Sequence, residues 1–80
     1  MVYELQARFD ARKSFYGKAQ VEDTTEGIFL YSYNRNVAKI IGGQLILCPD
    51  WNYSQTTRRH VKEFCRQFDV EEQFNELKRG

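Results

Sequence analysis

The sequence predicts an α+β domain. A four- or five-stranded, mainly antiparallel sheet has a C-terminal helix packed on one face, and a short tail helix follows. Three observations predict this fold. Alternating apolar and polar residues recur through residues 1–48, a helix-period apolar stripe runs through residues 54–68, and a second stripe runs through residues 69–80. A chain of 80 residues forms a single domain, residues 1–80, with residues 49–53 as the loop between sheet and helix.

The strands are predicted from two-residue alternation and from turn residues. The predicted strands are residues 2–9, 14–22, 28–33, 37–41 and 44–48. Asn34 and Asn36 interrupt the third run, since asparagine tolerates turn and bulge geometry. Gly42 and Gly43 predict a tight hairpin turn, and Pro49 ends the last strand because it has no N–H to donate to a neighbour.

The main helix is predicted from its cap and its apolar stripe. Ser54, Thr56 and Thr57 are all candidate N-caps, because a hydroxyl accepts from the free amides of the first turn. Four apolar residues fall within about 60° of one another on a helical wheel: Val61, Phe64, Cys65 and Phe68. This stripe is expected to face the sheet.

The tail carries a second stripe, Val70, Phe74 and Leu77, at spacings i, i+4 and i+7. In one continuous helix this stripe would lie opposite the first one. One alternative is that the helix breaks near Asp69, which would cap a new helix with Glu72 completing a capping box. The other is that the helix continues and gives the stripe to a partner or to a second copy of the chain. We favour the break and keep Val70, Phe74 and Leu77 as candidate residues of a homodimer interface.

Composition sets limits on function. Twelve basic and eleven acidic residues give a net charge of +1, so there is no bulk electrostatic attraction to nucleic acid or to an anionic membrane. No apolar run approaches the roughly 20 residues that span a bilayer. The first residues are polar or acidic where a secretion signal needs an apolar stretch. We therefore expect a cytoplasmic protein with no membrane partner.

The titratable residues predict neither a metal site nor an enzyme. A structural zinc ion needs four ligands, and the sequence offers His60, Cys48 and Cys65, the two cysteines being expected as thiols in a reducing cytosol. No acid is spaced to orient His60, and Cys65 lies about 140° round the helix from it. His60 is expected to pack or to form a hydrogen bond at the rim between helix and sheet. We expect no catalytic residues, no metal and no cofactor.

Two surfaces are candidates for binding. The first is a sheet face with the aromatic and basic residues Tyr16, Lys18, Phe29, Tyr31 and Tyr33. Such a face can stack the bases of single-stranded nucleic acid, bind a protein, or form an ordinary sheet surface, because aromatic residues are also good strand formers. The second surface is the outer stripe of the helix, with Arg58, Arg59, Lys62 and Arg66. This stripe either binds an anionic group or is a solvated face with internal ion pairs.

Trp51 is the only tryptophan and lies in the loop before the helix. It either anchors that loop on the core or is an exposed contact residue for a partner.

Three stretches resemble a family of small domains of unknown function from phages, prophages and other mobile elements. They are residues 14–19 (SFYGKA), residues 30–34 (LYSYN) leading to Val37 and Ala38, and residues 56–64 (TTRRHVKEF). The resemblance implies a mobile-element context. Small phage proteins without catalytic groups commonly act by occupying a surface of a host protein, as inhibitors of host defence of the anti-CRISPR kind do.

The leading functional expectation is therefore a non-enzymatic protein-binding module with a host protein as partner. One alternative is a single-stranded nucleic-acid-binding protein that uses the aromatic and basic sheet face. The other is a small structural homodimer held by the tail stripe.

Overall fold

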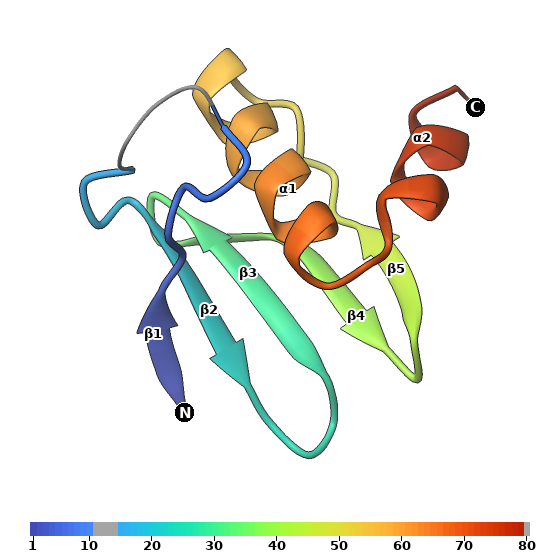
Figure 1. Ribbon diagram of the computed structural model, residues 1–80, viewed down its shortest axis with the longest axis horizontal. Helices are drawn as coiled ribbons and strands as arrows, with labels where there is room; N and C mark the ends of the chain where they lie inside the picture. Colours follow the sequence, from blue (N-terminus) through green and yellow to red (C-terminus); the bar gives the residue numbers. More distant parts are fainter. Residues whose placement is uncertain (11–14, 80) are drawn as a thin grey trace.

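The computed structural model describes residues 1–10 and 15–79. In this part of the chain five strands form one antiparallel sheet, in sequence order: β1 (Val2–Glu4), β2 (Ala19–Asp23), β3 (Ile28–Ser32), β4 (Arg35–Ile41) and β5 (Gln44–Leu47). Two helices follow, α1 (Gln55–Gln67) and α2 (Glu71–Arg79). Helix α1 crosses one face of the sheet, and α2 lies beside α1 against β5 (Figure 1). The predicted α+β class is confirmed, with five strands.

The first strand is shorter than predicted. It ends at Glu4 because the chain then leaves β2 and binds α1 instead. The side-chain amide of Gln67 donates to the carbonyl of Gln6 (2.6 Å), and the Glu63 carboxylate accepts from the N–H of Phe9 (2.9 Å). Phe9 is consequently 54% exposed, whereas unbroken alternation from the buried Leu5 would put Phe9 on the core side.

The second strand also begins later than predicted. Ser14, its predicted first residue, lies outside the described residues. Tyr16 and Gly17 have φ angles of 52° and 75°, and the N–H of Lys18 donates to the carbonyl of Phe15 (3.0 Å). These residues form a tight turn with positive φ at both central positions, so the extended strand starts only after it.

Two tight turns connect β3 to β4 and β4 to β5. Tyr33 and Asn34 have φ angles of 52° and 68°, so the chain reverses there and β4 begins at Arg35, two residues earlier than predicted. Gly42 and Gly43, at φ 58° and 80°, form the predicted hairpin turn. Positive φ at both central residues matches the twist of an antiparallel hairpin.

A bulge lets β4 bury two consecutive side chains. Leu30 faces Ala38 and Tyr31 faces Asn36, so Val37 is an extra residue without a partner in β3. The side-chain amide of Asn36 donates to the carbonyls of Leu30 and Ala38, both at 3.1 Å, and so satisfies the backbone at the irregularity. Val37 and Ala38 are both buried as a result. The predicted irregularity at the asparagines is confirmed.

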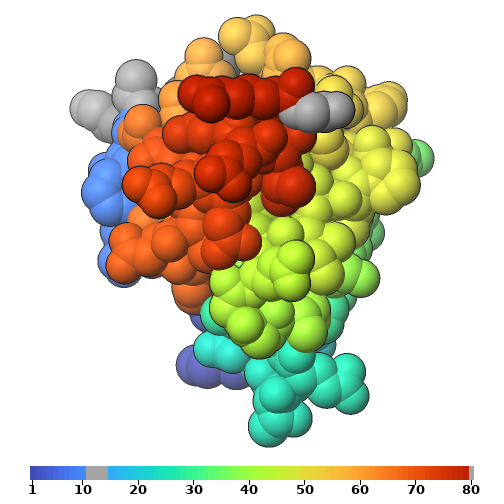
Figure 2. Space-filling view, turned by 90° about the vertical axis from the view of Figure 1, so that its right-hand side faces the viewer, coloured from blue at the N-terminus to red at the C-terminus, as the bar shows by residue number. Residues whose placement is uncertain are grey.

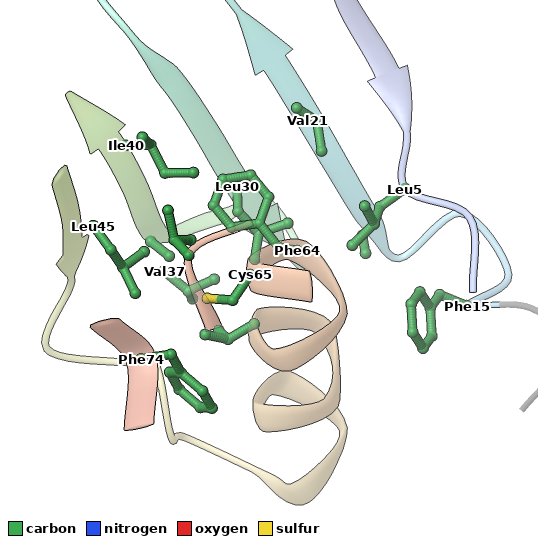
Figure 3. Packing of buried hydrophobic residues seen from close by; sticks show 14 residues of the cluster. Leu5, Phe15, Val21, Leu30, Val37, Ile40, Leu45, Phe64, Cys65 and Phe74 are labelled. Carbon is green, nitrogen blue, oxygen red and sulfur yellow. The ribbon is translucent and has the colours of Figure 1, made fainter. Parts of the chain in front are cut away.

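Helix α1 forms as its sequence predicts. Ser54 is the N-cap that the structure selects, with its hydroxyl accepting from the N–H of Thr57 (3.0 Å). Val61, Phe64 and Cys65 are fully buried against the sheet. Figure 3 shows Phe64 pointing from α1 towards Leu30, at the centre of the apolar cluster. The predicted contact between the apolar stripe and the sheet is confirmed.

The helix breaks where the tail begins, as the favoured alternative predicts, but Asp69 has a different role. Asp69 has a φ of 61° and the N–H of Val70 donates to the carbonyl of Cys65 (2.9 Å), a left-handed helix end. Asp69 therefore terminates α1 rather than capping α2. Val70 and Phe74 are then buried within the chain. Figure 2 shows the surface of α2 in direct contact with α1 and β5.

A glutamine fixes α2 to the sheet. Gln73 accepts from the N–H of Leu45 (2.8 Å) through Oε1 and donates to the carbonyl of Gly43 (3.0 Å) through Nε2. The side-chain amide thus replaces a neighbouring strand on the outer edge of β5. Covering an edge in this way removes a template for strand pairing with other chains.

Candidate functional site

An open groove of about 830 Å³ runs over the outer surface of α1. It is lined by the segment after β1, the loop before α1, α1 itself and α2. The lining residues are Phe9, Asp10, Trp51, Asn52, Gln55, Arg58, Arg59, Lys62, Glu63, Arg66, Phe74, Lys78 and Arg79. We call this surface the α1 groove. It contains all four basic residues that the sequence predicted as the outer helix stripe.

The α1 groove concentrates positive charge. Six cationic and two acidic side chains line it, a net charge of +4, while the whole protein has a net charge of +1. The rest of the protein is therefore net negative. A local excess of this kind attracts anionic groups even when the overall charge is small.

Two of the groove cations are held by neighbouring acids. Arg59 lies 3.3 Å from Asp10, and Arg66 lies 2.7 Å from Glu71. The hydrogen bond from Arg66 lowers the pKa of Glu71 below its ordinary value. These pairs orient the two arginines and neutralise part of their charge.

The other cations keep their charge available. Arg58 and Lys62 are exposed and form no ion pair or side-chain hydrogen bond within residues 1–10 and 15–79. Lys78 and Arg79, also exposed, come from the end of α2, and Nζ of Lys78 lies 5.1 Å from the ring centre of Phe74. The sequence predicted the cations on α1 but not those on α2, because only the break at Asp69 brings the tail beside α1.

Aromatic side chains lie among these charges. Phe9 is 54% exposed, an unusual state for phenylalanine. Trp51 is half-buried and packs edge-on against Phe74, with ring centres 5.5 Å apart and planes at 90°. Trp51 thus anchors its loop on the core, as one alternative predicted, and lines the α1 groove; its contact with a partner stays a prediction.

A buried carboxylate holds the Phe9 side of the groove in place. Glu63 is 2% exposed, and its Oε1 accepts from the N–H groups of Phe9 (2.9 Å) and Asp10 (3.0 Å). Its Oε2 accepts from the amide of Gln67 (2.6 Å). Burying a charge is costly unless several donors satisfy it, as they do here. Glu63, expected on the solvent side of the helix, therefore positions part of the α1 groove.

The sheet face opposite α1 holds only part of the predicted aromatic and basic set. Phe29 and Tyr31 lie on it, half-buried, beside Glu22 and Lys39. The Tyr31 hydroxyl donates to Glu22 (3.1 Å), and this acid together with burial raises the pKa of Tyr31. One cross-sheet row alternates apolar and charged residues: Val2, Glu22, Phe29, Lys39 and Ile46.

The remaining members of that set are only partly separated from it: Lys18 and Tyr33 line one hollow together with Tyr31. The ring of Tyr33 lies 5.9 Å from the ring of His60 on α1, so it does not project from the face opposite α1 as predicted. Tyr16 is 80% exposed in the turn before Lys18. The sequence missed these positions because both tyrosines sit in turns with positive φ, where strand alternation does not apply.

The tail residues pack within the chain. Val70 and Phe74 are 5% and 3% exposed, and Leu77 is 46% exposed. Of the three candidate interface residues, Leu77 alone is exposed. The tail stripe is thus largely part of the monomer core.

A buried serine–histidine contact was not predicted. Ser32 Oγ lies 2.8 Å from His60 Nδ1, and both residues are buried. The His60 ring packs edge-on against Phe15, with ring centres 4.6 Å apart, and burial lowers the pKa of His60 to about 4. His60 Nε2 has no hydrogen-bond partner among the described residues. His60 packs and forms a hydrogen bond, as expected, but it is fully buried and not at the rim between helix and sheet; its partner Ser32 was not predicted.

Residues with metal-binding or redox chemistry are dispersed. Within residues 1–10 and 15–79 no group of three or more His, Cys, Asp or Glu side chains could hold a metal ion. Cys48 and Cys65 are both free thiols, and burial raises the pKa of Cys65 to about 12. Neither described helix is long and apolar enough to cross a lipid bilayer.

Comparison with curated proteins and with solved structures found no match. The model of one protein family, DUF8033, matches residues 3–79. This match covers the sheet, both helices and all the residues of the α1 groove. The chain therefore belongs to DUF8033, a family of unknown function.

Proposed function

We propose that this protein is a non-enzymatic protein-binding module and that the α1 groove is its contact surface. The observation that carries the proposal is the net charge of +4 gathered there, on a protein of net charge +1. Charge complementarity of this kind steers partners to one face and selects against wrong ones. Exposed Phe9 and half-buried Trp51 add apolar area to the same surface.

The groove is a better contact surface than the sheet face opposite α1. On that face Glu22 receives the hydroxyl of Tyr31, and Lys39 is flanked in its row by Phe29 and Ile46. Apolar and charged residues alternate there, which is typical of a solvated sheet surface. In the groove, by contrast, Arg58 and Lys62 are adjacent on one helical face, and neither forms an ion pair with another described residue.

The proposal extends to biological context. The resemblance of residues 14–19, 30–34 and 56–64 to mobile-element domains supports an origin in a phage or mobile element. In that setting the partner is a host protein in the cytoplasm, and the activity is inhibition of a host defence system.

Capture experiments with charge-reversal variants test the role of the groove. The tagged protein and the variant Arg58→Glu/Lys62→Glu are compared in lysate of the source organism, with captured proteins quantified by mass spectrometry. The variant is expected to capture at least about tenfold less of the specific partner than the unmodified protein. A loss of about 1.4 kcal/mol of binding free energy lowers the affinity tenfold.

Lys18→Glu/Lys39→Glu is the matched control, because it changes the net charge by the same amount on other surfaces. It is expected to capture the same partner as the unmodified protein. If the control loses the partner and the groove variant keeps it, the binding surface lies on the sheet and not in the α1 groove. Circular dichroism confirms that both variants are folded.

A further inference from the structure

We infer that the groove binds an acidic stretch of polypeptide that carries a large apolar side chain. This inference rests on the proposed function and specifies the chemistry of the partner. The bound segment has two components, a large apolar side chain and carboxylates on either side of it. These correspond to two features of the α1 groove.

The first feature is the placement of exposed cations on two walls, where Glu71 acts on Lys62 and Lys78 without an ion pair to either. Arg58 and Lys62, one turn apart on α1, form one wall, and Lys78 and Arg79 at the end of α2 form the other. None of the four forms an ion pair with another described residue. A segment lying between them therefore needs acidic groups along both of its sides.

The second feature is the apolar surface that lines the same groove. The Phe9 ring is more than half exposed although its backbone is pinned by the buried Glu63 carboxylate. Trp51 is fixed edge-on to Phe74. Rigid aromatic groups that are already positioned bind an apolar side chain at little entropic cost.

The groove also sets the length of the segment. The α1 residues that line it run from Gln55 to Arg66, which corresponds to about 16 Å along a helix axis. A partner helix of about three turns, or about five residues of extended chain, covers that distance.

A polypeptide fits this surface better than a nucleic acid. Asp10 and Glu63 lie in the same groove as the cations. Both of these acids are shielded, Asp10 by Arg59 and Glu63 by burial, but Glu71, beside Arg66, has a side chain that is 41% exposed. A nucleic acid carries a phosphate at every nucleotide and would meet the Glu71 carboxylate, whereas a polypeptide can place its acids only where a cation faces them. The apolar surface likewise matches one side chain rather than a series of stacked bases.

Fluorescence anisotropy with three labelled probes tests the inference. The first probe is an acidic peptide with leucine and phenylalanine on one helical face. The second has serine at those apolar positions, and the third is an oligothymidylate of the same net charge. We expect the first probe to bind at least about tenfold more tightly than either of the others.

Two variants identify the contacts. Phe9→Ser is expected to weaken binding of the first probe by about tenfold and to leave the second unchanged, while Arg58→Glu/Lys62→Glu weakens both peptides. Tyr53→Ser is the control, since Tyr53 is 73% exposed and lies outside the groove.

Three outcomes overturn the inference: equal affinity for the two peptides, tighter binding of the oligothymidylate, or no binding of any probe. None of them alone removes the proposed function, which fails only if capture from lysate is independent of Arg58 and Lys62. The two failures are therefore distinguishable.

Discussion

Phe64→Ala is expected to lower the free energy of unfolding by about 3–5 kcal/mol. Phe64 is fully buried at the centre of the apolar cluster, and its ring centre lies 5.0 Å from that of Phe68. Removing the ring leaves a cavity between α1 and the sheet that the surrounding strands cannot fill. A domain of this size has a total stability of about 4–12 kcal/mol, so much of the variant should be unfolded at physiological temperature.

Urea denaturation followed by circular dichroism measures this effect. Phe29→Ala is the matched control, because it removes the same side chain from the sheet face opposite α1, where Phe29 is only half-buried. The control should lose clearly less stability. An equal loss in the two variants would contradict the placement of the core between α1 and one face of the sheet.

The protein is expected to lose about 3 kcal/mol of stability between pH 6.5 and pH 4 through His60. Burial lowers the pKa of His60 from 6.5 to about 4. In this pH range the unfolded chain binds a proton at His60 and the folded chain does not, so falling pH favours unfolding. Well above pH 6.5, from about pH 7.5, His60 is neutral in both states and contributes no pH dependence.

Urea midpoints at a series of pH values between 7 and 4 test this effect, with His60→Gln as the control. Glutamine cannot titrate but can still form a hydrogen bond with Ser32, which contacts His60 at 2.8 Å. The variant should show a flatter profile over this range. An unchanged slope would mean that His60 is accessible to protons in the folded protein.

The sequence was most informative where a single helix-period stripe decides the structure. Val61, Phe64 and Cys65 were predicted to face the sheet, and they do. An amphipathic helix on a sheet buries its apolar side chains only when that side is turned towards the sheet. The hairpin at Gly42 and Gly43 was equally predictable, since positive φ is cheap for glycine.

Strand prediction failed where long-range contacts or turns replaced strand pairing. Unbroken alternation would put Phe9 on the core side, but Glu63 and Gln67, more than fifty residues away, bind the backbone of that segment. Tyr33 and Asn34 adopt positive φ angles that residue type alone does not require. In each case the competing interaction comes from a part of the chain that local pattern does not include.

The candidate site was predictable only in part, because helical periodicity specifies some of its residues and tertiary structure brings in the others. The helix stripe of Arg58, Arg59, Lys62 and Arg66 follows from helical periodicity and was predicted as a unit. Phe9, Lys78 and Arg79 join it only through tertiary structure, because they come from opposite ends of the chain. The Ser32–His60 contact likewise needs the packing of α1 on β3, which sequence spacing does not specify.

Site-specific photo-crosslinking in living cells of the source organism tests the central claim most directly, namely that partners bind at the α1 groove. A photoreactive amino acid is introduced at Lys62 in the groove or at Lys39 on the opposite face of the sheet. The account predicts a discrete cross-linked protein from position 62 and none from position 39. A cross-linked species from position 39 alone or equally from both positions, or none from either, would contradict it.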